Sequence, residues 1–219
     1  MKNIGFFGVR SPLIVDLEET CHRLGYNIEY GVSVTGTPRI SDMTKVVDLE
    51  QVDAAHRSIA VIPCAFSPQR RQSLYQQAEK TGFRISDCLV DPTAILPRTF
   101  RADFGGYVNA GVVIGGVTTL GLGVLINRNA SVGHHCQIDD FVSIGPGAVL
   151  AGNIRVGAKS VIGAGAVIQP DVRIGKNVVV AAGTVVRKNV PDNSLISGNP
   201  GKILKRKPLH STLDVPGGE

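Results

Sequence analysis

The sequence predicts two parts of different fold class, a small α/β domain followed by a β-solenoid. Residues 1–88 alternate between short apolar segments and segments with helical spacing, whereas from Val90 an aliphatic residue recurs at every sixth position. Glycine is abundant, at 26 of 219 residues, and aromatic residues make up only 5%. Many glycines with few aromatics favour a turn-rich β-architecture over a helical bundle. We therefore expect an α/β domain at 1–88, a β-helix at 89–199 and a basic tail at 200–219.

The first 88 residues are expected to form alternating strands and helices. Apolar runs predict strands at 3–9, 26–34 and 58–63, and helical spacing predicts helices at 14–24 and 68–81, which end before Gly25 and Gly82. This β-α-β order predicts a small, parallel, Rossmann-like sheet. Such domains bind ligands beyond the carboxyl ends of their strands, so we expect a substrate site there.

From Val90 the period of six continues without insertion to Pro191. A fixed short period is the mark of a solenoid, and six residues fit a short strand plus a turn. A β-sandwich or a right-handed β-helix does not require so strict a period. The first and fifth residues of each hexad are expected to point inward, with glycine or asparagine relieving strain at the corners. The first residues are Val90, Leu96, Ala102, Val108, Ile114, Leu120, Ile126, Val132, Ile138, Ile144, Leu150, Val156, Ile162, Ile168, Ile174, Val180 and Val186.

Four stretches resemble the hexapeptide transferases and, more narrowly, the PglD/NeuD-like bacterial sugar acetyltransferases. They are IAVIPCAFSPQRRQ, DPTAILP, NRNASVGHHCQIDDFVSIGPGAVLAGNIRVG and SGNPGKILKR. The resemblance implies a left-handed β-helix with three hexads per coil, and a homotrimer with active sites between neighbouring subunits. It also implies acetyl-CoA as cosubstrate, with no metal, and transfer to the amino group of a nucleotide-linked amino sugar in polysaccharide biosynthesis. Acetylation of a sugar or sialic acid hydroxyl is the alternative.

His134 is the candidate general base. With His135 it forms the only histidine pair of the repeat, and the register places Cys136 inward, so both imidazoles should project from the coil. The resemblance places the catalytic base at His134, and imidazole suits the removal of a proton from an attacking amine or hydroxyl. His135 stands where relatives often carry an acidic residue. Asp139 and Asp140 are therefore candidates to orient the base, or else belong to a solvated turn.

The resemblance also indicates residues for coenzyme A. Ser143 stands where many relatives carry a second histidine near the acyl group. Gly152 follows His134 by one coil, and its backbone N–H is a candidate donor to the oxyanion. Ala164 and Ala182 are small and one coil apart, so a pantetheine arm fits along their backbone. The basic residues of the tail are candidates for the cofactor phosphates, or else are simply solvated: Lys202, Lys205, Arg206 and Lys207.

The loop after the first strand is the candidate substrate site, with Gly8, Arg10 and Ser11. Relatives carry Gly-Gly-His or Ser-Gly-His in this loop and an acidic pair after the second strand. This chain keeps Gly8 but has Ser33 and Val34 in place of the acidic pair. Arg10 is suited to a bidentate phosphate contact. The sequence therefore leaves the nucleotide open.

Composition narrows the remaining function classes. The net charge of +5 fits a polyanionic ligand, and no arginine-rich arm points to nucleic acid. The sequence shows no signal peptide or membrane span, and four scattered cysteines form no CxxC pair, so we expect a cytoplasmic protein. A metal site of the γ-carbonic anhydrase type needs three histidines, whereas the repeat offers an adjacent pair. A non-catalytic scaffold is the remaining alternative to an enzyme.

Overall fold

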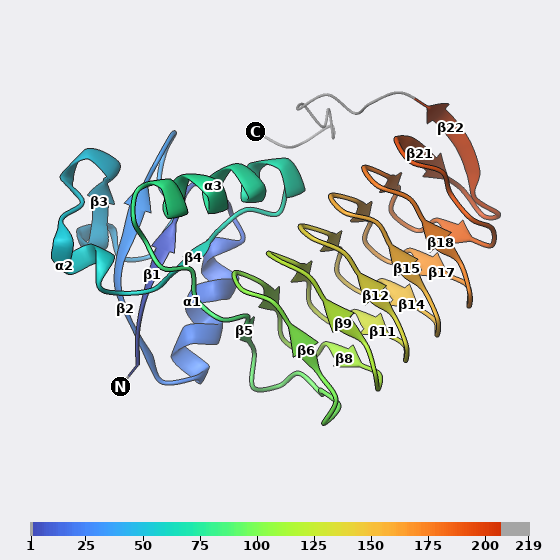
Figure 1. Cartoon of the computed structure of the whole chain (residues 1–219), viewed down its shortest axis with the longest axis horizontal. Helices are drawn as coiled ribbons and strands as arrows, with labels where there is room; N and C mark the ends of the chain where they lie inside the picture. The colour runs from blue at the N-terminus through green and yellow to red at the C-terminus, as the bar shows by residue number, and fades with distance from the viewer. Residues whose placement is uncertain (1, 207–219) are drawn as a thin grey trace.

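The computed structural model describes residues 2–206 (Figure 1). The first part of the chain forms four parallel strands in the order β3-β2-β1-β4, which confirms the predicted Rossmann-like sheet. Its elements are β1 (Lys2–Phe7), α1 (Ile14–Arg23), β2 (Tyr26–Ser33), η1 (Met43–Lys45), β3 (Val46–Asp48), η2 (Leu49–Gln51), α2 (Ala54–Arg57), β4 (Val61–Pro63) and α3 (Pro68–Lys80).

The two long helices lie where the sequence predicts them, and local capping explains where α3 begins. α3 begins with Pro68 behind Ser67, whose Oγ accepts the backbone N–H of Arg70 at 3.5 Å. The strand predicted at 58–63 is shorter than expected, because the chain before it forms α2. Asp53 caps that helix by accepting the backbone N–H of His56 at 3.0 Å. Neither α2 nor β3 was predicted.

The second part is a left-handed parallel β-helix of hexapeptide repeats, as predicted, and its coils stack away from the N-terminal sheet (Figure 1). The first sheet contains β5 (Leu89–Val90), β7 (Tyr107–Val108), β10 (Leu125–Ile126), β13 (Ser143–Ile144), β16 (Val161–Ile162), β19 (Val179–Val180), β21 (Ser194–Ser197) and the antiparallel β22 (Lys202–Arg206). The second contains β8 (Val113–Ile114), β11 (Ser131–Val132), β14 (Val149–Leu150), β17 (Val167–Ile168) and β20 (Val185–Val186). The third contains β6 (Arg101–Ala102), β9 (Thr119–Leu120), β12 (Gln137–Ile138), β15 (Arg155–Val156) and β18 (Arg173–Ile174).

From Gly105 to Gly183, one residue in every six holds a left-handed backbone at the corner of the coil. Glycine and asparagine occupy most of these corners, but Val117, His135 and Phe141 also adopt φ of 62°, 56° and 55°. The glycines at the second place of the hexad meet a different requirement. A Cβ on Gly133 would lie 2.5 Å from the carbonyl oxygen of Ala151 in the next coil. Corner strain therefore explains the left-handed positions, whereas close stacking of the coils explains the second-place glycines.

In each two-residue strand the first residue points outward from the coil. The outward residues of the three sheets differ in character, so the helix has three different faces. The covered face lies under the N-terminal part, and its outward residues Leu89, Tyr107, Leu125 and Ser143 are all buried. The apolar face is formed by the second sheet, where Val113, Val149 and Val167 are 41%, 42% and 36% exposed. The polar face is formed by the third sheet, with Arg101, Thr119, Gln137, Arg155 and Arg173 all exposed.

Buried polar contacts join the N-terminal part to the covered face. Arg71 of α3 is 1% exposed and donates from Nε to the carbonyl of Gly123 at 2.6 Å. Burial lowers the pKa of its guanidinium to about 9. On the other side, Asp91 accepts hydrogen bonds from Thr20 and Arg23 of α1 at 2.7 and 2.8 Å. These contacts set the position of the N-terminal sheet on the first coils.

Over residues 2–206, none of the helices has the length and apolar character needed to cross a bilayer.

Candidate active site

His134 and His135 lie at the corner that follows β11. Their neighbour Cys136 is 0% exposed in the core, and burial raises the pKa of its thiol, so the register prediction for this hexad is confirmed. Both imidazoles are exposed, and their Nδ1 atoms are 3.0 Å apart. The ring centroids are 5.2 Å apart at an interplanar angle of 86°. The two histidines therefore form a hydrogen-bonded pair on the surface of the coil.

The carboxylates considered as orienting groups lie on the next corner. The Oδ1 atom of Asp140 accepts the backbone N–H of Leu122 at 3.0 Å, and Asp139 lies 3.9 Å from Arg155. Both side chains thus serve the turns of the third sheet. Of the two alternatives, these contacts favour the turn over an orienting role, and the hydrogen-bond partner of the His134 ring is His135, which sequence spacing alone did not indicate.

Gly152 lies directly against the imidazole of His134. A Cβ built on Gly152 would lie 2.6 Å from Cε1 and 2.7 Å from Nε2 of His134, so only a glycine leaves room for the ring in this position. Among the described residues, no acceptor is found for the backbone N–H of Gly152. The corner therefore places the imidazole of His134 against the backbone of Gly152.

Ser143 does not lie where a cofactor could reach it in this chain. Its side chain is 0% exposed, accepts a hydrogen bond from Arg71 at 2.9 Å and donates one to the carbonyl of Phe66 at 2.6 Å. The register correctly points Ser143 outward from the coil, but the N-terminal part covers it. The expected coenzyme A contact of Ser143 is therefore replaced by a structural role.

Ala164 and Ala182 are exposed at the corner that follows β16 and β19. That corner joins the first sheet to the second sheet, whereas the corner of His134 joins the second sheet to the third. One chain therefore does not bring the two alanines and His134 together. Lys202 is exposed on β22, and Lys205 and Arg206 continue that strand, while Lys207 falls outside the described residues.

The loop after β1 contains one glycine with a packing role and one polar residue used locally. Gly8 has φ of 84°, and a Cβ there would lie 2.6 Å from both methyl carbons of Leu74 in α3. The Oγ atom of Ser11 accepts the backbone N–H of Leu13 at 3.3 Å. Gly8 thus lets α3 approach the sheet, and the Ser11 side chain helps to shape the start of α1.

Arg10 and Arg70 converge at the carboxyl ends of β1, β2 and β4. Arg10 is exposed and lies over Gly36, where an added Cβ would be 2.6 Å from its Cδ. Arg70 donates to the Oγ1 of Thr35 at 2.9 Å, and burial together with the charge of Arg10 lowers its pKa. Neither guanidinium takes part in the ion pairs found among residues 2–206. Sequence reasoning missed Arg70, although the Ser67-Pro68 cap places its turn at this edge.

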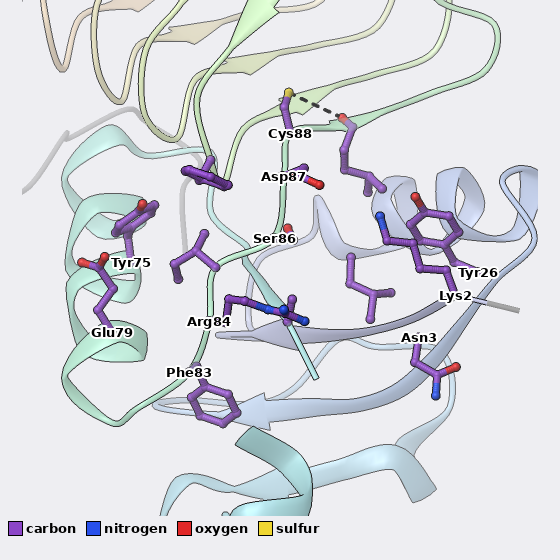
Figure 2. Close-up of a pocket in the computed structure, with 15 residues that line it drawn as sticks. Lys2, Asn3, Tyr26, Tyr75, Glu79, Phe83, Arg84, Ser86, Asp87 and Cys88 are labelled. Carbon is purple, nitrogen blue, oxygen red and sulfur yellow. Dashed lines mark hydrogen bonds between the residues drawn. The ribbon is translucent and has the colours of Figure 1, made fainter. Parts of the chain in front are cut away.

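Two hollows lie elsewhere on the surface. Figure 2 shows the larger one, a cavity of about 630 Å³ between α3, the amino end of β1 and residues 84–88. The rings of Tyr26, Tyr75 and Phe83 line it, and none of the predicted site residues does. The second lies on the polar face and includes Asp139 and Asp140. Among the described residues, no group of three or more metal-binding side chains is present.

Both the repeat and the two-part fold have matches among known proteins. The family model described as "Bacterial transferase hexapeptide (six repeats)" matches residues 153–188. The acetyltransferase domain of PglB from Neisseria gonorrhoeae, in complex with acetyl coenzyme A, is 27% identical at a TM-score of 0.82, over 93% of this chain and 99% of that chain.

Two further solved structures share the architecture. A mutant of perosamine N-acetyltransferase from Caulobacter crescentus, in complex with CoA and GDP-perosamine, is 26% identical at a TM-score of 0.82, over 93% of this chain and 96% of that chain. WeeI from Acinetobacter baumannii is 23% identical at a TM-score of 0.69, over 93% of this chain and 100% of that chain, and supports the fold alone. The chain therefore carries a bacterial transferase hexapeptide repeat at residues 153–188 and shares the two-part fold of these solved acetyltransferases.

Proposed function

We propose that this protein transfers the acetyl group of acetyl-CoA to the amino group of a nucleotide-linked amino sugar, with His134 as the general base. The observation that carries the proposal is the imidazole of His134 packed against Gly152, where only a glycine leaves room for the ring. It is supported by the shared architecture with PglB and with perosamine N-acetyltransferase, whose structures contain acetyl coenzyme A, or CoA and GDP-perosamine.

The proposed reaction is a direct transfer in a ternary complex. The acceptor nitrogen bonds to the thioester carbonyl carbon while Nε2 of His134 takes its proton, and the negative charge gathers on the carbonyl oxygen. The N–H of Gly152 is the proposed donor to that oxygen. The C–S bond then breaks, and the thiolate of CoA leaves and recovers a proton from the imidazolium. No acyl-enzyme is required, and Cys136 is buried in the core and plays no part.

Arg10 and Arg70 are the proposed contacts for the diphosphate of the sugar nucleotide. Arg10 follows β1 and Arg70 lies on α3 after β4, so the two guanidiniums meet where the strand order of the sheet reverses. Ligands of open α/β sheets bind at such a switch point. Guanidinium groups bind phosphate oxygens in a planar, bidentate manner. This pair replaces the glycine-histidine loop that the sequence lacks, while Gly8 and Ser11 shape the turn beside it.

The site is proposed to be completed by further copies of the chain in a homotrimer. His134 lies at the edge of the apolar face, where exposed valines leave apolar surface without a partner in the single chain. The covered face is already occupied, and the polar face carries arginines. Ala164 and Ala182 lie at a different corner of the coil from His134, so a neighbouring copy must supply them if they line the same cleft. Four free cysteines fit a cytoplasmic location.

The proposal is tested by incubating the protein with acetyl-CoA and a panel of nucleotide-linked amino sugars, with thiol release and product mass as readouts. We expect turnover with at least one amino sugar, and a loss of about 10²-fold or more in His134→Ala, because general base catalysis contributes that much. His22→Ala, which removes an exposed histidine of α1, is the matched control. Acetylation of hydroxyl acceptors alone would favour the O-acetyltransferase reading. Full activity in His134→Ala would refute the mechanism.

A further inference from the structure

We propose that His134 and His135 act as a dyad, in which His135 accepts a hydrogen bond from the Nδ1–H of His134 and so holds the base in its reactive tautomer. The inference rests on the proposed acetyltransferase function and adds a positioning residue to it. The imidazole of His135 takes the place of the acidic residue that orients the base in similar enzymes.

The geometry of the pair allows two proton arrangements, of which one supports catalysis. A single proton bridges the two Nδ1 atoms, which are 3.0 Å apart. If His134 were the acceptor, its own proton would lie on Nε2, and that nitrogen could not act as a base. If His134 is the donor, its Nε2 has a free lone pair. That edge of the ring faces Gly152, where the proposed oxyanion donor lies. The ring is thus held at its Nδ1 edge by His135, and its Nε2 edge faces Gly152.

No carboxylate competes with His135 for this role among the described residues around the ring. The equivalent corners of the neighbouring coils carry Gly116 and Val117 on one side and Gly152 and Asn153 on the other. The backbone N–H of Asn153 donates to the carbonyl oxygen of His134 at 2.9 Å, which anchors the corner but leaves the imidazole free. His135 is therefore the side chain that determines the orientation of the base.

The left-handed backbone at His135 explains how adjacent side chains meet. In a regular strand, successive side chains point to opposite sides. With φ of 56° at His135, the chain turns and the two rings come to a centroid distance of 5.2 Å. The next corner in the chain carries Phe141 with φ of 55°, and the following coil carries Asn153 with φ of 60°. This helix thus accepts both phenylalanine and asparagine in the backbone conformation of position 135.

These corners supply a matched pair of variants. His135→Phe keeps an aromatic ring that can stack edge-on against His134 but removes the hydrogen-bond acceptor. His135→Asn keeps an acceptor, the side-chain Oδ1, in a backbone conformation that asparagine tolerates well. The full-length protein is labelled with ¹⁵N in its histidine rings, and the His134 signals are identified by their loss in His134→Asn. The tautomer of His134 is then read directly, at a pH where imidazole is neutral.

We expect Nδ1 of His134 to carry the proton in the wild type and in His135→Asn, and Nε2 to gain it in His135→Phe. In the acetyl-transfer assay, His135→Phe should lower kcat about tenfold or more at unchanged KM for acetyl-CoA, since a base in the wrong tautomer cannot accept the proton. His135→Asn should keep kcat within about threefold of the wild type. Thermal unfolding checks that both variants fold.

Two results would overturn the dyad. One is a wild-type His134 with its proton on Nε2, and the other is a folded His135→Phe with wild-type kcat. The ring signals do not depend on turnover. If no acceptor is acetylated by the wild type, the transferase proposal fails, while the tautomer of His134 still decides whether the dyad exists.

Discussion

Replacement of Gly152 by alanine tests the active-site corner at the level of a single methyl group. The added Cβ would lie 2.6 Å from Cε1 of His134, whereas ordinary contacts begin at 3.4 Å. The imidazole must therefore move by roughly 0.8 Å, or the coil must open. A displacement of about 1 Å in a reacting group can cost about 10²-fold in rate, so we expect a loss of kcat of that order.

The assay is thiol release from acetyl-CoA under saturating acceptor, with Gly116→Ala as the matched control. Gly116 holds the equivalent corner one coil before His134, and a Cβ there would meet nothing closer than Thr99 Oγ1 at 3.9 Å. We expect Gly116→Ala to keep the wild-type kcat, and both variants to unfold at temperatures close to that of the wild type. The backbone N–H at position 152 is retained in Gly152→Ala, so the loss reports on the base. A Gly152→Ala enzyme with unchanged kcat would show that His134 does not act from this position.

Three further predictions concern the substrate site, the assembly and stability. Changing Arg10 and Arg70 together to glutamine should raise KM for the sugar nucleotide about tenfold or more and leave KM for acetyl-CoA unchanged, because the guanidiniums are proposed to bind the diphosphate; equal effects on both constants would contradict this. Val149→Glu should convert the proposed trimer to smaller species in sedimentation experiments, because it places a charge on the apolar face, whereas Arg155→Glu on the polar face should not. Burial would raise the pKa of the Asp91 carboxyl, but hydrogen bonds from Thr93, Thr20 and Arg23 lower it to about 2. Asp91 therefore contributes about 2 kcal/mol to the free energy of unfolding above about pH 4, and this contribution is lost as the pH falls towards about 2. Asp91→Asn should remove that pH dependence in denaturant titrations.

The repeat could be predicted from sequence because each hexad carries its own evidence. The positions of Val132 and Cys136 within their hexad are enough to place both in the core and the two histidines outside. The segment that forms β3 and α2 has no such period. It is short and polar, and α2 depends on the cap that Asp53 provides. The sequence therefore contains no signal for α2, and the predicted strand extends back to residue 58, before the start of β4.

The parts of the site that were missed depend on contacts between distant residues. Register shows that Ser143 points outward, but it cannot show that Arg71, 72 residues earlier, covers it. Arg10 and Arg70 are likewise far apart in the sequence and meet through the strand order of the sheet. The contact of His134 with His135 depends on a left-handed corner that asparagine and glycine would signal, but histidine does not.

The left-handed corners have a consequence for how such a protein can acquire new chemistry. Each coil places its corner residues directly beside those of the coils before and after, at the roughly 4.8 Å spacing of neighbouring strands. The inward residues alone hold the core, so Val117, His135 and Asn153 occupy interchangeable sites in a single column. A change at one of these sites alters the reactive surface without repacking the interior. The solenoid thus keeps the residues that make it stable separate from the residues that make it reactive, one coil at a time.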